Sequence, residues 1–455
     1  MAPKRMLIDA SHPEETRVAI VSGQYLEDFD VEVESRRQLR GNIYLAKVTR
    51  VEPSLQAAFV DYGGNRHGFL AFSEIHPDYY QIPVADREAL VAEQKVAETE
   101  AENLSGAAEE EPPSDESPAV ETLGGDDTED VQARRPPVLK RRYKIQEVIK
   151  RRQILLVQVV REERGTKGAA LTTYLSLAGR YCVLMPNTAR GGGISRKINI
   201  SADRKRLKSI LGLLGIPDSM AVIVRTAGQK RSKSEIKRDY DYLMRVWSAV
   251  RETTLESMAP CLVHEEGDLI KRSIRDHYDK DISEIIIDGN SGYRIAKDFM
   301  KLLMPSHARR VKQYADAVSL FQRASVEDQL AAMYNPVVQL KSGGYLVINP
   351  TEALVSIDIN SGRSTKEHGI EQTATATNLE AAKEIARQLR LRDMAGLVVI
   401  DFIDMEHNSN IRKVERTMKD ALKNDRARIQ VGRISGFGLM EMSRQRLRTG
   451  VLEAT

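Results

Sequence analysis

The sequence predicts a multidomain protein that combines α/β and all-β regions. At 455 residues the chain is long enough for several domains, each with its own hydrophobic core. Close to the N-terminus, short segments rich in strand formers alternate with glycine-containing turns, which indicates a small all-β unit. In the last third, apolar β-branched runs alternate with segments of helical spacing, which is typical of an α/β layer.

The all-β unit is expected to be a small antiparallel barrel. Residues 41–51 and 56–62 carry the strand pattern, and the glycine-rich turn at 63–65 leads into a further short strand. An insertion at about 88–140 interrupts the barrel, and the apolar run at 154–160 supplies a later strand.

The insertion is strongly acidic and the rest of the chain is basic. Residues 91–130 contain fourteen Asp or Glu and one Lys, so the remaining chain carries a net charge of +16 although the total is only +3. Pro, Ala, Gly and Ser fill the rest of this stretch, so we expect it to be disordered. A basic run follows at 134–152. A cationic folded body favours a polyanionic partner over an acidic one.

Composition also limits the cellular setting. Hydrophobic residues make up 41% of the chain, and no run has the length of a membrane span. The first ten residues are charged and lack the apolar core of a signal peptide, so we expect a cytoplasmic protein. Only Cys182 and Cys261 occur, without a Cys-x-x-Cys pair, which indicates reduced thiols and argues against a zinc site within these residues.

Two aspartates mark the α/β region as a candidate active site. Asp358 lies in the apolar run at 353–359, and Asp401 ends the run at 397–401. The segment between them, 372–394, has helical spacing, so the two strands are expected to be parallel neighbours that bring both carboxylates to one sheet edge. Further elements are expected at 344–348, 409–424 and 428–434.

Paired carboxylates suit a hard divalent cation such as Mg2+, which removes their mutual repulsion. Asn360 lies on the same strand face as Asp358 and is expected to orient a ligand or water. A simpler interpretation is a salt bridge with a nearby arginine, and the sequence offers Arg363, Arg387, Arg390 and Arg392. Asp404 is a weaker alternative to Asp401, because it falls past the expected end of the strand.

The barrel carries aromatic and basic residues in alternation. Phe59, His67 and Phe69 are candidates for stacking on nucleic-acid bases, and Lys47, Arg50, Arg66 and Lys167 are candidates for contacts with the backbone. The alternative is that the phenylalanines belong to the barrel core. The pattern favours single-stranded RNA as the partner.

Several sequence blocks together identify the chain as similar to the ribonuclease E/G family. They include Gly-Asn-Ile-Tyr at 41–44, Glu-Glu-Arg-Gly-Thr-Lys-Gly at 162–168, Val-Arg-Thr-Ala-Gly at 224–228, Ile-Asp-Ile-Asn-Ser-Gly-Arg at 357–363 and Glu-Met-Ser-Arg-Gln-Arg at 441–446. The resemblance covers the whole chain apart from the acidic insertion.

This resemblance implies a specific domain order. An RNase H-like domain is split between residues 1–37 and 271–333, and we find no carboxylate cluster in it that resembles an active site. An S1 RNA-binding barrel of the OB type, at 38–179, and a 5′-sensor domain, at 180–270, are inserted between its halves. A deoxyribonuclease I-like α/β catalytic domain follows at 334–455.

The resemblance also implies an activity. Family members are Mg2+-dependent endoribonucleases that cut single-stranded, often AU-rich RNA in RNA processing and mRNA decay, leaving a 5′-phosphate and a 3′-hydroxyl. Asp358 and Asp401 match the metal ligands, and Asn360 matches the residue that positions the scissile phosphate. The remaining matches are Phe59, Phe69 and Lys167 as RNA-binding residues, and Arg225, Thr226, Gly179, Val183 and Arg428 as the 5′-monophosphate sensor. The alternative function is a non-catalytic S1-type RNA-binding module.

The resemblance finally implies assembly. Family members carry a Cys-x-x-Cys zinc link after the block at 441–446, and this sequence contains no such pair. We expect the Zn2+ ligands, the dimerisation region and a C-terminal region that recruits RNA-decay enzymes to lie outside these residues. A homo-oligomer, dimer or tetramer, is expected for the full-length protein.

Overall fold

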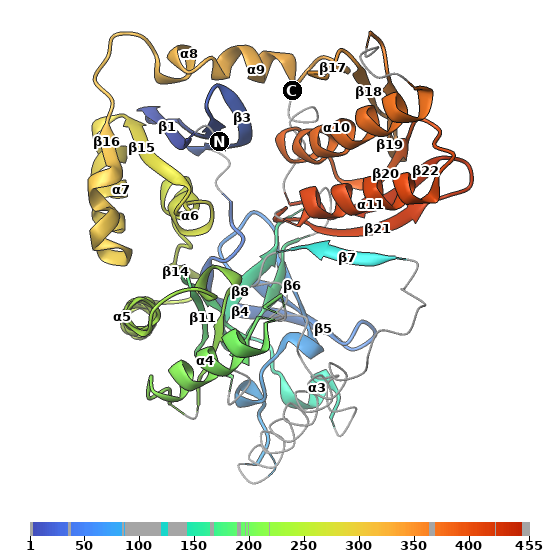
Figure 1. Cartoon of the computed structure of the whole chain (residues 1–455). Helices are drawn as coiled ribbons and strands as arrows, with labels where there is room; N and C mark the ends of the chain where they lie inside the picture. The colour runs from blue at the N-terminus through green and yellow to red at the C-terminus, as the bar shows by residue number, and fades with distance from the viewer. Residues whose placement is uncertain are drawn as a thin grey trace.

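The computed structural model describes residues 3–34, 38–83, 86, 120–125, 143–163, 168–188, 193–195, 197–198, 200–217, 219–363, 369–423 and 425–447. Lys167 and most of the acidic insertion therefore lie outside the described residues. Within the described part, four β-sheets with flanking helices form three groups (Figure 1). The N-terminal sheet and the C-terminal α/β layer stand above the barrel and its neighbouring small sheet in that view.

The first sheet joins the two ends of a long sequence interval. Its order is β16-β15-β1-β2-β3, and the parallel pair β1–β15 connects its two halves. Asp9 faces Asp288 across this pair, so the region holds a carboxylate pair that the sequence analysis did not find. The core lies between this sheet and helices α6 and α7. Its elements are β1 (Lys4–His12), β2 (Glu15–Ser22), β3 (Tyr25–Val33), β15 (Ile282–Asp288), β16 (Val311–Gln313), α6 (Leu269–Asp276) and α7 (Asn290–Leu303).

The predicted barrel is present and closed. Strands β4, β5, β6, β9 and β8 pair in that order, and β4 also pairs with β8, which removes the free edges. Strand β14 (Cys261–His264) adds to β4 from outside the barrel. The barrel elements are β4 (Ile43–Glu52), β5 (Ala57–Asp61), β6 (Gly68–Ala71), β8 (Ile154–Arg161), β9 (Ala170–Thr172) and the short helix α3 (Ile145–Val148).

A small sheet follows the barrel, with the order β10-β11-β13-β12. Helices α4 and α5 cover it, and Trp247 is partly buried against their shared core. The elements are β10 (Leu177–Ala178), β11 (Cys182–Met185), β12 (Gly193–Ile194), β13 (Ala221–Val224), α4 (Ser201–Gly212) and α5 (Lys233–Glu256).

The C-terminal α/β layer is built on a seven-stranded sheet of order β17-β18-β19-β20-β22-β21-β7. Helices α10 and α11 pack side by side on one face of it (Figure 1). The predicted strand–helix–strand unit is confirmed as β19, α10 and β20, with the two strands parallel. The elements are α8 (Leu320–Arg323) and α9 (Val326–Ala332), which precede the sheet, then β17 (Val337–Gln339), β18 (Tyr345–Pro350), β19 (Leu354–Asn360), α10 (Ile370–Leu391), β20 (Gly396–Asp401), α11 (Asn408–Leu422), β21 (Arg428–Ile434) and β22 (Leu439–Arg444).

One strand of this sheet comes from the acidic insertion. Strand β7 (Glu121–Gly124) pairs antiparallel with β21, so the prediction of disorder is wrong for these four residues. An unpaired strand edge presents backbone donors and acceptors that another strand can satisfy. Leu123 packs against the core beneath the sheet, which adds apolar contact to that pairing.

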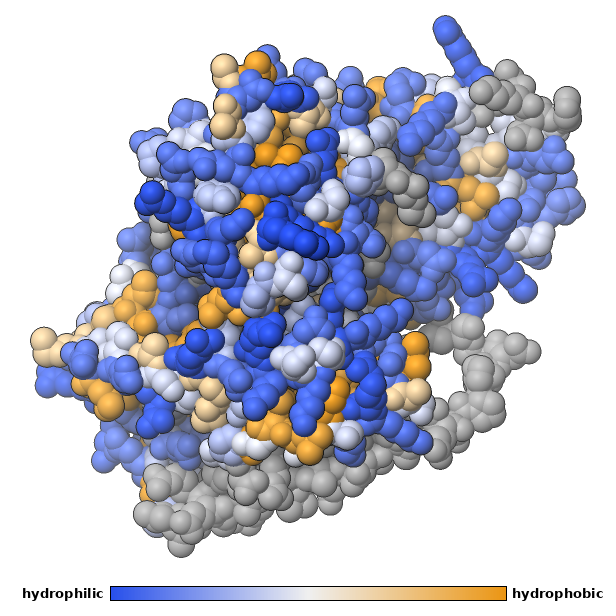
Figure 2. Space-filling view, turned by 60° about the vertical axis from the view of Figure 1, so that its left-hand side comes forward, coloured by the Kyte–Doolittle hydropathy of each residue, from blue (hydrophilic) through white to orange (hydrophobic). Residues whose placement is uncertain are grey.

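The face of the molecule drawn in Figure 2 is largely polar. Figure 2 shows hydrophilic residues over most of one face, with smaller apolar patches between them. No described helix combines the length and the apolar character needed to cross a bilayer.

Candidate functional site

The two aspartates predicted to act together stand opposite each other. Asp358 is the register partner of Asp401 across the parallel strands β19 and β20. Neighbouring strands lie about 4.8 Å apart, and register partners in a parallel pair point to the same face. Their sequence neighbours Ile357 and Ile400 are buried in the core under α10, so both carboxylates project from the opposite, solvent-facing side of the sheet.

Asn360 and Asp404 border this pair. The Asn360 side-chain amide donates a hydrogen bond to Asp358 Oδ2 at 2.9 Å, which fixes the orientation of that carboxylate. Slight desolvation of this exposed carboxylate, followed by the negative charges of Asp358 and Asp404, raises the pKa of Asp401. Gly438, at φ +77°, leaves space here, since an added Cβ would lie 3.3 Å from Asp404 Oδ1 and 4.0 Å from Asp401 Oδ1. Asp404 lies beyond the end of β20, but its negative charge acts on Asp401.

The salt-bridge interpretation fails for the described residues. Arg387 pairs with Glu384, Arg392 bonds to Gln388, and Arg390 reaches a backbone carbonyl of α11. Neither Asp358 nor Asp401 forms an ion pair with any described arginine or lysine. Two close carboxylates without a cationic partner repel each other, and a bound cation relieves that repulsion.

The donor set fits a hard cation that keeps much of its hydration. Within the part of the chain that the structure describes, no group of three or more His, Cys, Asp or Glu is arranged to hold a metal ion. Mg2+ is usually held by one or two carboxylates plus several waters, which matches two carboxylates and an amide. Cys182 is buried in β11 and Cys261 lies in β14, so these thiols do not form a metal-binding pair like the one expected for Zn2+.

The barrel presents an aromatic surface outside its core. Phe59 and Phe69 are partners across β5 and β6, with ring centroids 6.1 Å apart and an interplanar angle of 73°. The Arg50 guanidinium lies over the Phe59 ring at 4.8 Å. Both rings are partly exposed and absent from the barrel core cluster, so the core alternative does not describe them. Lys47, Arg66 and His67 are exposed on the same barrel, and Lys167 lies outside the described residues.

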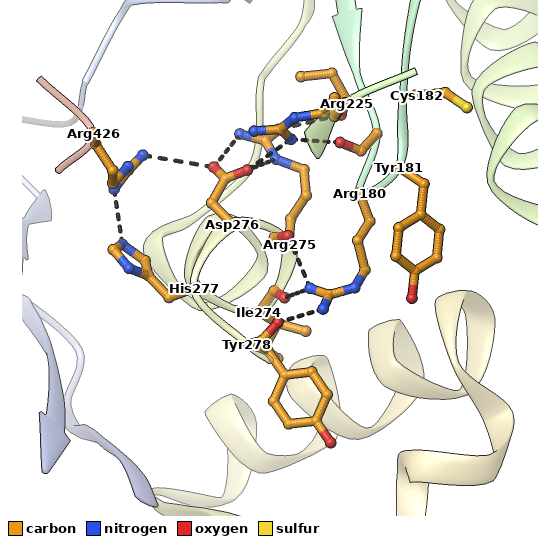
Figure 3. A network of polar contacts seen from close by, with 12 residues as sticks. Arg180, Tyr181, Cys182, Arg225, Ile274, Arg275, Asp276, His277, Tyr278 and Arg426 are labelled. Atoms are coloured by element: carbon orange, nitrogen blue, oxygen red, sulfur yellow. Dashed lines mark hydrogen bonds and ion pairs between the residues drawn. The ribbon is translucent and has the colours of Figure 1, made fainter. Parts of the chain in front are cut away.

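Four of the residues predicted to read a 5′-phosphate lie around the end of β13, and the fifth, Arg428, begins β21 in the C-terminal sheet. Arg225 follows β13, and its Nη1 donates to the Gly179 carbonyl at 2.7 Å and to Asp276 Oδ1 at 2.9 Å (Figure 3). Thr226 begins the exposed turn that follows. Val183 is fully buried in β11, so it supports the site from within the small sheet and does not line its surface.

Asp276 lies beside the predicted sensor residue Arg225 and was not among the residues that the sequence analysis named. Besides Arg225, its carboxylate contacts Arg275 Nη2 at 2.9 Å and Arg426 Nη2 at 3.6 Å (Figure 3). Burial alone would raise the pKa of Asp276, but Arg275, Arg225 and Arg426 outweigh it and hold that pKa well below its usual value. The Asp276 carboxylate, at the end of α6, thus contacts Arg225 of the small-sheet region and Arg426 of the C-terminal layer. Arg426 lies two residues before the predicted sensor residue Arg428. The run Arg-Asp-His-Tyr at 275–278 was the available sequence signal.

A second buried aspartate shapes the loop around Gly179. Asp239 Oδ2 accepts hydrogen bonds from the backbone N–H of Tyr181 at 2.8 Å and of Cys182 at 2.9 Å. An added Cβ at Gly179 would lie 2.6 Å from Asp239 Oδ2, so only glycine fits there. Residue 179 therefore serves the geometry of the loop that receives the Arg225 guanidinium.

The sequence of this chain is similar to those of known ribonucleases. A model of the Ribonuclease E/G family matches residues 176–447. Ribonuclease E of Haemophilus influenzae is 46% identical over 452 residues, covering 99% of this chain and 43% of that protein. Ribonuclease E of Escherichia coli is 43% identical over 453 residues, covering 99% and 38%, respectively. Ribonuclease G of Escherichia coli is 33% identical over 439 residues, covering 96% and 79%. The chain spans about two fifths of the length of these two ribonuclease E relatives.

Proposed function

Because this chain belongs to the ribonuclease E/G family, we propose that it is an endoribonuclease that acts in RNA processing and decay. The proposed substrate is single-stranded, AU-rich RNA, cut by Mg2+-dependent hydrolysis to a 5′-phosphate and a 3′-hydroxyl. The observation that carries this proposal is the register of Asp358 with Asp401 on an open sheet face, without a cationic partner among the described residues.

The proposed roles follow from position. Asp358 and Asp401 would hold Mg2+, and Asn360 fixes the Asp358 carboxylate through its 2.9 Å hydrogen bond. A bound Mg2+ would supply Lewis-acid polarisation of the scissile phosphate and an activated water. On the barrel, Phe59 and Phe69 would stack on bases, each contributing about 1 to 3 kcal/mol without sequence preference.

Replacing Asp358 separates catalysis from binding. We expect Asp358→Asn to reduce cleavage of an AU-rich oligonucleotide by at least about 100-fold, as loss of a charge-stabilising group does in other enzymes. RNA affinity without Mg2+ should stay within a few fold, because the barrel surface is untouched. Ser356→Ala on the same strand face is the matched control. Cleavage near the wild-type rate would refute the assignment.

The alternative is an RNA-binding module without catalysis. Its support is the partly exposed Phe59–Phe69 pair with Arg50. A binder has no use for paired carboxylates, so wild-type protein that binds the oligonucleotide but leaves it intact with Mg2+ present would favour this alternative.

We further propose that a 5′-monophosphate stimulates cleavage through Arg225 and Thr226. A guanidinium fork and a hydroxyl are suited to phosphate oxygens. Arg225 is only 8% exposed and contacts Asp276, so its replacement by alanine also leaves Asp276 with one cation fewer. The exposed Thr226 gives the cleaner variant.

We expect Thr226→Val and Arg225→Ala to narrow the difference in cleavage rate between 5′-monophosphorylated and 5′-hydroxylated oligonucleotides. Rates for the hydroxylated substrate should remain close to wild type, since it offers no phosphate to this pocket. An unchanged difference in both variants would remove the sensor proposal. Partners beyond RNA, namely a homo-oligomer joined through Zn2+ and RNA-decay enzymes in the cytoplasm, are proposed for the full-length protein only.

A further inference from the structure

We propose that strand β7 is an internal regulator of the 5′-phosphate site. By docking on β21, it places Gly124 and Gly125 beside Arg428 and Lys197, two cations that an RNA 5′-end would use, and it thereby reduces stimulation by a 5′-phosphate. This inference rests on the proposed function, because it concerns the regulation of that same site.

Strand β7 is held on β21 and α11 by several kinds of contact. Residues Glu121 to Gly124 pair with β21, and the Gly125 N–H donates to the Ala427 carbonyl at 3.0 Å. Leu123 packs against the core of the C-terminal layer. Glu121 Oε1 lies 3.1 Å from Lys419 Nζ on α11. Backbone, apolar and ionic contacts thus all hold this part of the insertion on the sheet edge.

The strand ends at the predicted sensor residue. Gly124 is the register partner of Arg428, and the Lys197 ammonium donates to the Gly125 carbonyl. A Cβ added at Gly125 would lie 3.7 Å from Arg428 Cβ and 3.8 Å from Lys197 Nζ. The glycine pair therefore sits between a cation of the C-terminal layer and one of the small-sheet region.

Glycine is required at this junction. Gly124 and Gly125 have φ angles of +66° and +90°, which other residues rarely adopt. At Gly124 a Cβ would also lie 2.3 Å from the Ala427 carbonyl oxygen. The glycine pair therefore allows the backbone at the end of β7 to approach Arg428 closely.

The negative charge of the stretch that contains β7 allows it to compete with RNA for the cations Arg428 and Lys197. The stretch 91–130, to which β7 belongs, has a net charge of −13, and Gly125 is followed in the sequence by Asp126 and Asp127. A tethered anionic segment competes with a free ligand at an effective concentration on the order of millimolar. A four-residue strand at a sheet edge makes few ladder hydrogen bonds, so we expect its docking to be reversible and RNA to be able to displace it.

A designed disulfide tests the docking directly. Thr122 faces Gln430 across the ladder, and both are exposed. Since the Gly125–Ala427 pair is hydrogen-bonded, the alternation of an antiparallel ladder makes Thr122–Gln430 a non-hydrogen-bonded pair, with a Cα separation of about 4.5 Å. That separation is within the range for a disulfide, about 4.4 to 6.8 Å.

The locked protein should respond weakly to a 5′-phosphate. The variant is Thr122→Cys with Gln430→Cys and Cys261→Ser, and Cys182 is retained because its burial raises the pKa of its thiol and keeps it unreactive. We expect oxidation to lower the rate ratio of 5′-monophosphorylated to 5′-hydroxylated RNA by at least about 5-fold, with recovery on reduction. Failure to form the cross-link, or a cross-link that leaves the ratio unchanged, would overturn the inference.

Releasing the strand should have the opposite effect. We expect Leu123→Asp to raise the same ratio and the affinity for a 5′-monophosphorylated oligonucleotide by at least about 3-fold. Thr122→Ala, on the exposed face of the same strand, is the matched control. Asp126→Asn with Asp127→Asn tests whether charge contributes, with a rise expected. An unchanged ratio in Leu123→Asp overturns the inference, whereas absence of cleavage in the wild-type protein overturns the proposed function instead.

Discussion

Two pairs of aspartates occupy equivalent positions in different sheets of this protein. Asp358 faces Asp401 across the parallel strands β19 and β20, and Asp9 faces Asp288 across the parallel strands β1 and β15. In both sheets the pair stands towards the carboxyl ends of its strands, where ligand sites of α/β proteins are usually found.

The pairs differ in how their charge is neutralised. Asp9 is 6% exposed and accepts hydrogen bonds from Arg17 Nη2 and from Ser11 Oγ, each at 2.6 Å. Arg17 also pairs with Glu327 at 3.0 Å and lies over the Phe321 ring. Asp358 and Asp401 are exposed and receive one described side-chain hydrogen bond, from the neutral amide of Asn360.

The same strand register therefore gives two aspartate pairs whose carboxylates have different partners. The Arg17 guanidinium neutralises Asp9 of the first pair and gives that carboxylate a structural role. The second pair lacks that cation, which leaves its repulsion to be relieved by a ligand. The predictions that follow test whether the two pairs divide their roles in this way.

The largest expected effect on stability comes from removing the internal cation. Arg17→Ala leaves Asp9 buried without its partner, so we expect the free energy of unfolding of the N-terminal sheet to fall by about 2 to 4 kcal/mol. Urea denaturation monitored by circular dichroism measures it. Lys301→Ala, which removes an exposed pair on α7, is the control and should change stability by less than about 0.5 kcal/mol. An Arg17 variant as stable as wild type would contradict the structural role of this pair.

The shift in unfolding temperature that Mg2+ produces, measured by calorimetry, should depend on the Asp358–Asp401 pair and not on the Asp9–Asp288 pair. At about ten times the dissociation constant, Mg2+ should raise the unfolding temperature of the C-terminal layer by about 2 to 5 °C in wild-type protein. Asp401→Asn should abolish this shift, because it removes one of the two carboxylates. Asp288→Asn should retain it. Equal loss of the shift in both variants would show that the two pairs do not differ in metal binding.

Local patterns explain how much of this site the sequence could predict. The apolar runs of β19 and β20 and the helical spacing of α10 are local patterns, and together with the usual crossover they predict that Asp358 meets Asp401. The closed barrel follows from similar short strands and turns. The sequence named Phe59 and Phe69 as candidates for stacking, but the structure was needed to show that both lie outside the barrel core, since alternation does not reveal which face of a barrel strand is outside.

Contacts between distant residues could not be predicted in this way. The Asp276 cluster joins Arg225, Arg275 and Arg426, whose sequence separations carry no periodic signal. Strand β7 is a four-residue segment, Glu-Thr-Leu-Gly, within an acidic stretch, and its pairing with β21 depends on an edge more than 300 residues away. Composition favoured disorder there, but tertiary pairing and the burial of Leu123 outweighed it.

The smallest expected effect concerns acid stability. Burial would raise the pKa of Asp9, but hydrogen bonds from Ser11 and Arg17 outweigh it, so the net pKa lies below the usual value of 3.8. A carboxyl with a lowered folded-state pKa stabilises the protein above pH 3.8 and loses that contribution as the pH falls through its folded-state pKa. Wild-type protein should therefore lose stability more steeply below this pH than Asp9→Asn, measured as unfolding free energy against pH.

The contribution of Asp288 to stability should change in the opposite direction. The pKa of Asp288 is raised by burial and by Asp9, so its protonation on acidification removes repulsion within the pair and stabilises the folded protein. Parallel pH profiles for wild type and Asp9→Asn would show that Arg17 does not stabilise the ionised form of Asp9.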